Sequence, residues 1–328
     1  MNSFNPIEQR LLNEFQHDFP LVSQPYLAIG EQLGVGENEV IDRLGELSRQ
    51  GAVSRVGPVF SPGCIGASTL AALAVPEERL EALAHWLNAM PEINHNYQRE
   101  HRYNLWFVAA APDEAWLDVI VQKIAAESRC PMLVLPLVER YHIDLGFDLR
   151  DGHRCHGRGV SDSLMRVRLD ASQRAIVGAL QGGLGLARRP FDQIAGLNEE
   201  AVIRQVAQWR EQGVIKRFGV VVRHHEVGYR ENAMVVWDVP DERVSELGRL
   251  ASNQEGVTLC YRRPRQLPDW PYNLFCMVHG TDRVKVRFQI AQLARHAGLE
   301  GYGSQVLFSC RRFKQCGARY VGDGHGRH

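Results

Sequence analysis

The residues that could do chemistry gather in one short stretch, His-Asn-Tyr-Gln-Arg-Glu-His, at positions 95–101. Alternate side chains of an extended strand point to the same side of a sheet. A strand here would therefore place four polar side chains on one face: His95, Tyr97, Arg99 and His101. Imidazole can donate a proton near neutral pH, and the planar guanidinium group binds a carboxylate through two parallel hydrogen bonds. These residue types could bind an acid and deliver a proton. By themselves they are more typical of a buried hydrogen-bond network or of ordinary surface residues, so the prediction of a site depends on the resemblance given below.

A second stretch, Cys-Tyr-Arg-Arg-Pro-Arg at positions 260–265, repeats the tyrosine and adds further arginines. A single arginine is usually a solvated surface residue, so the prediction depends on the whole set and on its placement in strands. The last predicted strand of each copy adds Arg140 in the first copy and Arg311 and Arg312 in the second. The expected catalytic residues are His95 and His101, and the residues expected to bind the substrate are Tyr97, Arg99, Tyr103, Arg140, Tyr261, Arg262, Arg263 and Arg265.

The composition is typical of a soluble globular protein and argues against nucleic-acid binding. The chain has 38 basic and 38 acidic residues, whereas proteins that bind nucleic acid usually concentrate positive charge. No apolar run is long enough to span a membrane, and the N-terminus lacks the apolar core of a secretion signal. The seven cysteines include no Cys-x-x-Cys pair, which favours a cytoplasmic location with reduced thiols. The cluster from His153 to His156 lacks a second ligand pair, so no metal site is expected.

The chain is a tandem duplication of one unit. Residues 39–60 align without a gap on residues 201–222, including a shared Gln-Gly pair. The Tyr-x-Arg sequence at 97–99 recurs at 261–263. A five-residue insertion then follows in the second copy. The stretch between the copies is rich in glycine, arginine and serine and predicts a linker.

Each copy predicts the same order of elements. Apolar residues at helical spacing indicate three helices before a β wing, as in a winged helix-turn-helix. Strand, helix, strand, strand, helix and strand follow, which is the order of a ferredoxin-like α+β domain. The fold class is therefore α+β, a duplicated winged helix-turn-helix plus βαββαβ domain. The expected domains are 1–62 and 63–148 in the first copy, a linker at 149–167, 168–226 and 227–321 in the second copy, and a tail at 322–328.

This order resembles the Lrp/AsnC family of regulators, which join a winged helix-turn-helix to a ligand-binding βαββαβ domain. The resemblance implies sheet-to-sheet pairing, which two copies in one chain could make internally as a pseudo-dimer; further homo-oligomers stay open. A recognition helix presents its N-terminal residues to DNA. These residues are acidic in both copies, with Glu37 and Glu39 in the first and Glu199 and Glu200 in the second. We therefore expect no DNA binding, although such acids are also ordinary at a helix start.

Two segments carry a more specific resemblance. The first is His-Asn-Tyr-x-Arg-x-His-x-Tyr-Asn-Leu-Trp-Phe at 95–107, and the second runs from Cys260 to Phe275 and includes Pro-Asp-Trp-Pro-Tyr-Asn-Leu-Phe. Both are similar to the signature segments of siroheme decarboxylases. The resemblance implies a fusion of the two subunit types of that enzyme. It also implies that the acetates on rings C and D of siroheme leave as carbon dioxide, giving didecarboxysiroheme for haem d1 or alternative haem biosynthesis. No cofactor is implied beyond the iron that siroheme carries.

Siroheme is a flat macrocycle rimmed by carboxylates, so the predicted tyrosines and arginines fit it. In a fully extended strand His95 and His101 would lie roughly 20 Å apart, a distance that a turn near Glu100 would shorten. One histidine is expected to donate the proton and the other to position a carboxylate or the ring, and which does which stays open. Because the second copy has Leu259 in place of His95, either one site uses arginines from both copies or a second, different site exists. The alternative function is a regulator that senses a tetrapyrrole or another small ligand.

Overall fold

The computed structural model divides the chain into two compact units. The helix-turn-helix unit contains residues 1–65, 146–228 and 319–328, and the sheet unit contains residues 66–145 and 229–318. Each unit therefore contains parts of both copies of the repeat. The structure describes residues 4–61, 63–143, 166–192, 194, 196–223 and 231–321. Most of the predicted linker, the histidine cluster within it and the predicted tail lie outside these residues.

The helix-turn-helix unit begins with the three helices expected for the first copy, which are α1 (Pro6–Glu14), α2 (Pro25–Leu33) and α3 (Glu37–Arg49). The second copy has α6 (Ala171–Leu180) and α7 (Glu199–Glu211). Between them, the described residues form turns, so the expectation of a middle helix in this copy is wrong. This segment contains Gly-Gly-Leu-Gly at 182–185 and Pro190, and glycine and proline both disfavour a helix interior.

The first helix of each copy begins at a capping box, in which two residues satisfy each other's free backbone donors. At α1 the Asn5 side chain accepts a hydrogen bond from the backbone N–H of Glu8 at 3.0 Å, and the Glu8 carboxylate accepts one from the backbone N–H of Asn5 at 2.9 Å. The same arrangement starts α6. The two wings, β1 (Val53–Phe60) and β7 (Ile215–Val222), pair antiparallel with each other. The copies are thus joined in this unit through their wings.

Among the described residues, the sheet unit forms one nine-stranded sheet. The strands of the first copy are β2 (Ala67–Leu73), β3 (Ile93–Arg99), β4 (Leu105–Ala111), β5 (Met132–Pro136) and β6 (Glu139–Ile143). The strands of the second copy are β8 (Glu231–Trp237), β9 (Val257–Arg262), β10 (Leu274–Gly280) and β11 (Ser304–Gln315). Their spatial order is β5-β2-β4-β3-β11-β8-β10-β9-β6.

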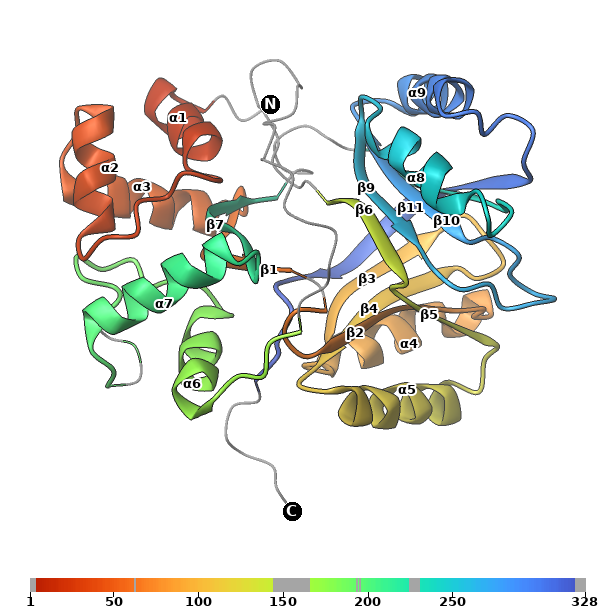
Figure 1. Ribbon diagram of the computed structural model, residues 1–328, viewed down its shortest axis with the longest axis horizontal. Coiled ribbons are helices and arrows are strands. Elements are labelled where there is room, and N and C mark those ends of the chain that lie inside the picture. The colour runs from red at the N-terminus through yellow and green to blue at the C-terminus, as the bar shows by residue number, and fades with distance from the viewer. Residues whose placement is uncertain are drawn as a thin grey trace. The chain divides into compact units, whose positions relative to one another are not determined.

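Helices cover one face of each half of this sheet. They are α4 (Glu77–Ala89) and α5 (Glu114–Ser128) in the first copy, and α8 (Val244–Ser252) and α9 (Arg283–His296) in the second. Figure 1 shows the two helix pairs on opposite sides of the unit. The other faces share a buried cluster to which both copies contribute, with Trp106 from the first and Phe275 and Leu307 from the second. The predicted α+β fold is therefore confirmed, and its two copies pair within one chain.

The last strand of each copy crosses to the other copy. The single strand expected at 132–143 is divided after Pro136: β5 pairs with β2, whereas β6 pairs with β9 of the second copy. Proline has no backbone donor and commonly ends a strand or occupies an edge. Strand β11 pairs with β8 as far as Phe308 and with β3 from Ser309 onward. This exchange places β11 of the second copy beside β3 of the first, and β6 of the first copy beside β9 of the second.

Candidate functional site

Strand β3 carries the face on which the predicted site is based. Asn96 points toward α4, where its side-chain amide donates a hydrogen bond to the carbonyl of Ala84 at 3.1 Å. On the opposite face, the rings of His95 and Tyr97 are nearly parallel, with centroids 6.1 Å apart. The guanidinium carbon of Arg99 lies 5.7 Å from the centroid of the Tyr97 ring. These three side chains share one face, as their alternation in the sequence predicts.

His101 departs from this pattern because β3 ends at Arg99. The backbone N–H of His101 donates to the carbonyl of Arg99 at 2.9 Å, which turns the chain. Of the two possibilities that the sequence leaves open, the structure has the turn near Glu100, and His101 therefore does not continue the extended face of β3. Its half-buried ring meets the ring of Trp270, from the insertion of the second copy, edge-on at 5.5 Å. Burial lowers the pKa of His101.

Arg99 is a buried cation with 6% of its surface exposed. It donates hydrogen bonds to the carbonyl of Leu307 at 2.9 Å and to the side-chain oxygen of Asn232 at 3.2 Å. Within the described part of the chain it forms no ion pair with a carboxylate. Burial lowers its pKa to about 10. A buried charge without a counter-charge is costly, so this position suits an anionic ligand.

Arg263 occupies the equivalent position in the second copy. Its guanidinium donates a hydrogen bond to the carbonyl of Leu135, on β5 of the first copy, and lies 5.2 Å from the centroid of the Tyr261 ring. Burial lowers the pKa of Arg263 to about 10 and raises that of Tyr261 to about 12. Each copy therefore holds a tyrosine-arginine pair, and each arginine donates to a main-chain carbonyl of the other copy.

The exchanged strands bring one more arginine to each pair. Arg140 on β6 is the cross-strand partner of Tyr261, and Arg312 on β11 is the cross-strand partner of Tyr97. Side chains directly opposite each other in an antiparallel pair share a face. The charges of these arginines act to lower the pKa of the facing tyrosine, although burial dominates and raises it. The sequence indicates these arginines but not that each lies beside the tyrosine of the other copy.

Tyr103 is a core residue in this structure, with 2% of its surface exposed. Its carbonyl accepts a hydrogen bond from the indole N–H of Trp106 at 2.6 Å. Burial raises the pKa of its hydroxyl. The contacts give Tyr103 a packing role, and its expected contact with substrate stays a prediction.

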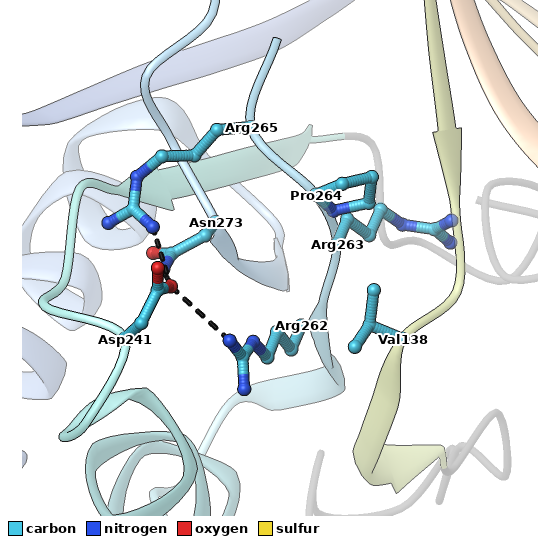
Figure 2. Close-up of a pocket in the computed structure, with 7 residues that line it drawn as sticks. All are labelled: Val138, Asp241, Arg262, Arg263, Pro264, Arg265 and Asn273. Carbon is cyan, nitrogen blue, oxygen red and sulfur yellow. Dashed lines mark hydrogen bonds and ion pairs between the residues drawn. The ribbon is translucent and has the colours of Figure 1, made fainter. Parts of the chain in front are cut away.

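Arg262 and Arg265 line a cavity of about 270 Å³ at the end of β9. Arg265 forms ion pairs with Asp238 at 2.8 Å and with Asp241 at 2.6 Å, and Arg262 pairs with Asp241 at 3.3 Å. Figure 2 shows both arginines directed toward Asp241, while Arg263 points the other way, toward β6. These two arginines therefore differ from Arg99 and Arg263 in having carboxylate partners. Strand β9 is separated from β3 by three strands in the sheet order.

Trp270 and Gln305 were not among the expected site residues. Trp270 is fully buried and contacts His101. Burial lowers the pKa of His101, and the nearby side chain of Gln305 acts to raise it. Both belong to the second copy and lie far from His101 in the sequence, so sequence proximity does not indicate that either is close to it. The tryptophan lies in the insertion that distinguishes the copies, which is the one signal that could have indicated it.

Neither a metal-ligand cluster nor a membrane-spanning helix is found among the described residues. They contain no group of three or more His, Cys, Asp or Glu side chains arranged to hold a metal ion. They also contain no helix of the length and hydropathy that crossing a membrane requires. The expectation that no cofactor is needed beyond the substrate's own iron stays a prediction.

Comparison with known proteins agrees with both resemblances. The family model of an AsnC-like ligand binding domain matches residues 65–142 and 226–314, and that of a siroheme decarboxylase NirDL-like HTH domain matches residues 8–53. The siroheme decarboxylase NirDL subunit of Paracoccus denitrificans is 40% identical over 322 residues, which cover 96% of this chain and 98% of that protein.

Two solved structures resemble the whole chain. The crystal structure of the siroheme decarboxylase NirDL has a TM-score of 0.70 at 28% identity and covers 97% of this chain and 95% of its own. The crystal structure of NirDL in co-complex with an iron-uroporphyrin III analogue has a TM-score of 0.68 at 27% identity and covers 97% of this chain and 94% of its own.

Proposed function

The chain belongs to the siroheme decarboxylase family, and we propose that it is a carboxy-lyase that converts siroheme to didecarboxysiroheme. Two acetate side chains would each lose their carboxyl group as carbon dioxide. The product would serve haem d1 or alternative haem biosynthesis, as the sequence resemblance implies. A solved relative in complex with an iron-uroporphyrin III analogue supports a tetrapyrrole as the ligand.

The observation that carries this proposal is the pair of arginines, Arg99 and Arg263, that lack carboxylate partners among the described residues. Each stacks on a tyrosine and is held by carbonyl groups. Siroheme would supply the missing anions from its rim and a flat surface for Tyr97 and Tyr261. Arginine and carboxylate make strong charge-assisted hydrogen bonds when both are shielded from water.

Decarboxylation requires that the acetate side chain is bound as a carboxylate and that one proton is delivered in each step. The bond between the methylene carbon and the carboxyl carbon breaks, carbon dioxide leaves, and the electron pair stays on the methylene carbon and spreads into the macrocycle. A proton then forms the new C–H bond of a methyl group. The imidazoles of His95 and His101 are the groups with a suitable pKa on or beside β3.

We propose a single site on the first copy, to which the second copy contributes positive charge. Leu259 stands where a second His95 would be, and leucine cannot donate a proton. In the first copy, Tyr97 and His95 lie on the same face of β3, and Arg312 of the second copy is the cross-strand partner of Tyr97. Both acetates would then react at one place, and the substrate would reorient between the two steps.

We propose that the helix-turn-helix unit does not read DNA. At the start of α7, the Glu199 carboxylate accepts a hydrogen bond from Ser23 of the first copy at 2.9 Å and pairs with Arg189. At the start of α3, Glu37 pairs with Arg188 of the second copy at 3.4 Å. The ends that would approach phosphates are therefore acidic and already occupied by side chains from both copies. No contact in the described chain favours the regulator alternative.

Anaerobic incubation of the purified protein with siroheme, without any added cofactor, tests the proposal by mass spectrometry. The expected tetrapyrrole product has lost two carbon dioxide units. A tetrapyrrole that binds tightly and stays unchanged would instead indicate sensing. The His95→Ala and His101→Ala variants serve as controls: if both fold and still release carbon dioxide at the parental rate, these histidines are not the site.

A further inference from the structure

The turn after β3 fixes the protonation of one of the two signature histidines. The backbone N–H of Tyr103 points at Nδ1 of His101 with a nitrogen-to-nitrogen distance of 2.9 Å. A backbone N–H can only donate, so Nδ1 must present its lone pair. A neutral imidazole carries one proton, which must therefore be on Nε2.

The second copy completes the surroundings of this ring. The Gln305 side chain, from β11, lies beside His101. Burial lowers the pKa of His101, and Gln305 acts to raise it. An amide oxygen there could accept a hydrogen bond from Nε2–H. The ring of Trp270 packs edge-on at 5.5 Å, and that of Tyr103 lies nearly parallel at 6.0 Å. Protonation of Nδ1 would break the Tyr103 hydrogen bond and place a charge against these rings.

The charged groups nearby do not favour a cation on His101 either. Arg102 lies in the same turn, and its positive charge acts against protonation of the ring. Asp269, from the insertion, pairs with Arg102 at 3.2 Å. Glu100 is bound by Arg283 of α9 at 2.7 Å. The segment of β11 that faces the turn, Ser304 to Phe308, contains no acidic residue.

Resting on the proposed function, we infer that His101 acts as a neutral hydrogen-bond donor, held by the backbone N–H of Tyr103 and packed against Trp270 of the second copy. The proton that ends on the methylene carbon then comes from His95. In that step the His95 imidazolium becomes neutral imidazole, the new C–H bond forms, and no oxidant or reductant is needed. The second copy, which lacks both signature histidines, therefore contributes to the site by packing Trp270 against a histidine of the first.

The first test replaces Gln305 by glutamate, which would stabilise an imidazolium at His101. In ¹⁵N spectra of histidine-labelled wild-type protein, His101 should show an unprotonated Nδ1 and a protonated Nε2 from about pH 6 to about pH 8. His101→Asn assigns the signals. In Gln305→Glu, both nitrogens should be protonated over the lower part of that range. These spectra need no activity, so an unchanged siroheme beside the expected spectra would sink the proposed function alone.

The same variant gives opposite kinetic predictions for the two roles. If His101 must be neutral, Gln305→Glu lowers kcat near pH 8 by about tenfold to a hundredfold. If His101 were the acid, the carboxylate would keep it protonated and raise kcat at that pH, which would overturn the inference. Gln122→Glu adds the same charge on an exposed turn of α5 and should leave kcat unchanged.

Chemical rescue separates the two histidines directly. Added imidazole should restore decarboxylation in His95→Gly in proportion to the imidazolium present. It should not do so in His101→Gly, because a diffusing imidazolium would not reproduce a fixed neutral donor. Rescue of His101→Gly alone, with the same dependence on imidazolium, would reverse the assignment.

Discussion

The two halves of the sheet unit, one from each copy, share a tyrosine-arginine pair and differ in the side chains next to it. Tyr97 with Arg99 and Tyr261 with Arg263 have the same spacing, the same stacking and the same kind of carbonyl partner across the copies. Only the first copy has histidines in the signature segment, His95 and His101, and Leu259 stands at the position of His95 in the second copy. Under the proposed function, both tyrosine-arginine pairs would bind carboxylates of the substrate rim, whereas a proton donor would be needed only at the reacting carbon.

The second copy also neutralises its extra arginines internally. Asp241 holds Arg262 and Arg265, whereas Glu77, in the equivalent Val-Pro-acid sequence of the first copy, forms no ion pair in the described residues. The two halves of the sheet unit therefore differ in the positive charge available to a ligand as well as in the presence of the two signature histidines. Four substitutions examine this difference, from the largest expected effect to the smallest.

His95→Leu makes the first copy resemble the second and should have the largest effect. Loss of a general acid costs about 10²- to 10⁴-fold in rate, so kcat for siroheme should fall by that factor while the fold is kept. Leu259→His, which makes the second copy resemble the first, should not restore activity in the double variant. Recovery of activity in the double variant would mean that a histidine in either copy can serve the reaction.

Trp270→Ala tests the contribution of the insertion. The indole is fully buried, with ring centroids 5.3 Å from Trp106 and 5.0 Å from Tyr272. Removing a buried tryptophan costs about 3–5 kcal/mol in the free energy of unfolding, measurable by urea denaturation. Trp116→Ala is the matched control, since that side chain is 45% exposed and should change the stability by less than about 0.5 kcal/mol.

Arg99→Met should weaken binding of iron uroporphyrin by about a hundredfold, in line with the cost of roughly 2–5 kcal/mol for removing one partner of a buried charge pair. Arg263→Met should weaken it much less if the ligand site is on the first copy. Spectrophotometric titration of both variants measures this. Equal losses would contradict the single-site proposal and indicate two equivalent sites.

Asp241→Asn should have the smallest effect. The hydrogen bond from Arg265 holds the pKa of Asp241 below its ordinary value. Its contribution to stability is therefore present above the pKa of the unfolded state and is lost as the pH falls through the lower folded pKa, below about 4. Because the side chain is 63% exposed, the loss at pH 7 should be under about 1 kcal/mol and shrink in high salt. Glu77→Gln is the control, since Glu77 is exposed and forms no ion pair in the described residues, and it should change the stability at pH 7 by less than about 0.5 kcal/mol.

The order of elements could be predicted because it depends on local patterns. Helical spacing, the Asn5 capping box and alternating strands are all readable within a few residues. The repeat predicts a middle helix in the second copy, but the glycines at 182–185 and Pro190 disfavour it, and the described residues there form turns instead. The shared face of His95, Tyr97 and Arg99 follows from strand alternation alone.

The pairing of strands between copies could not be predicted in the same way. Nothing local indicates that Pro136 separates two strands with different partners, or that β11 changes partner after Phe308. The placement of Arg312 beside Tyr97 and of Gln305 beside His101 depends on that exchange. The residue types at the site were visible in the sequence, and their partners were fixed by tertiary structure.

The crossing strands also determine when this protein can complete its fold. Strand β3 obtains its outer neighbour from β11, near the C-terminal end of the described chain, and β9 obtains its outer neighbour from β6. Contacts between residues so far apart in the chain have high contact order and form slowly. During synthesis the outer edge of β3 has no strand partner until β11 (Ser304–Gln315) has left the ribosome, and an unpaired edge is a place where chains aggregate. Yield in the cell should therefore depend on translation speed and on chaperones that shield this edge.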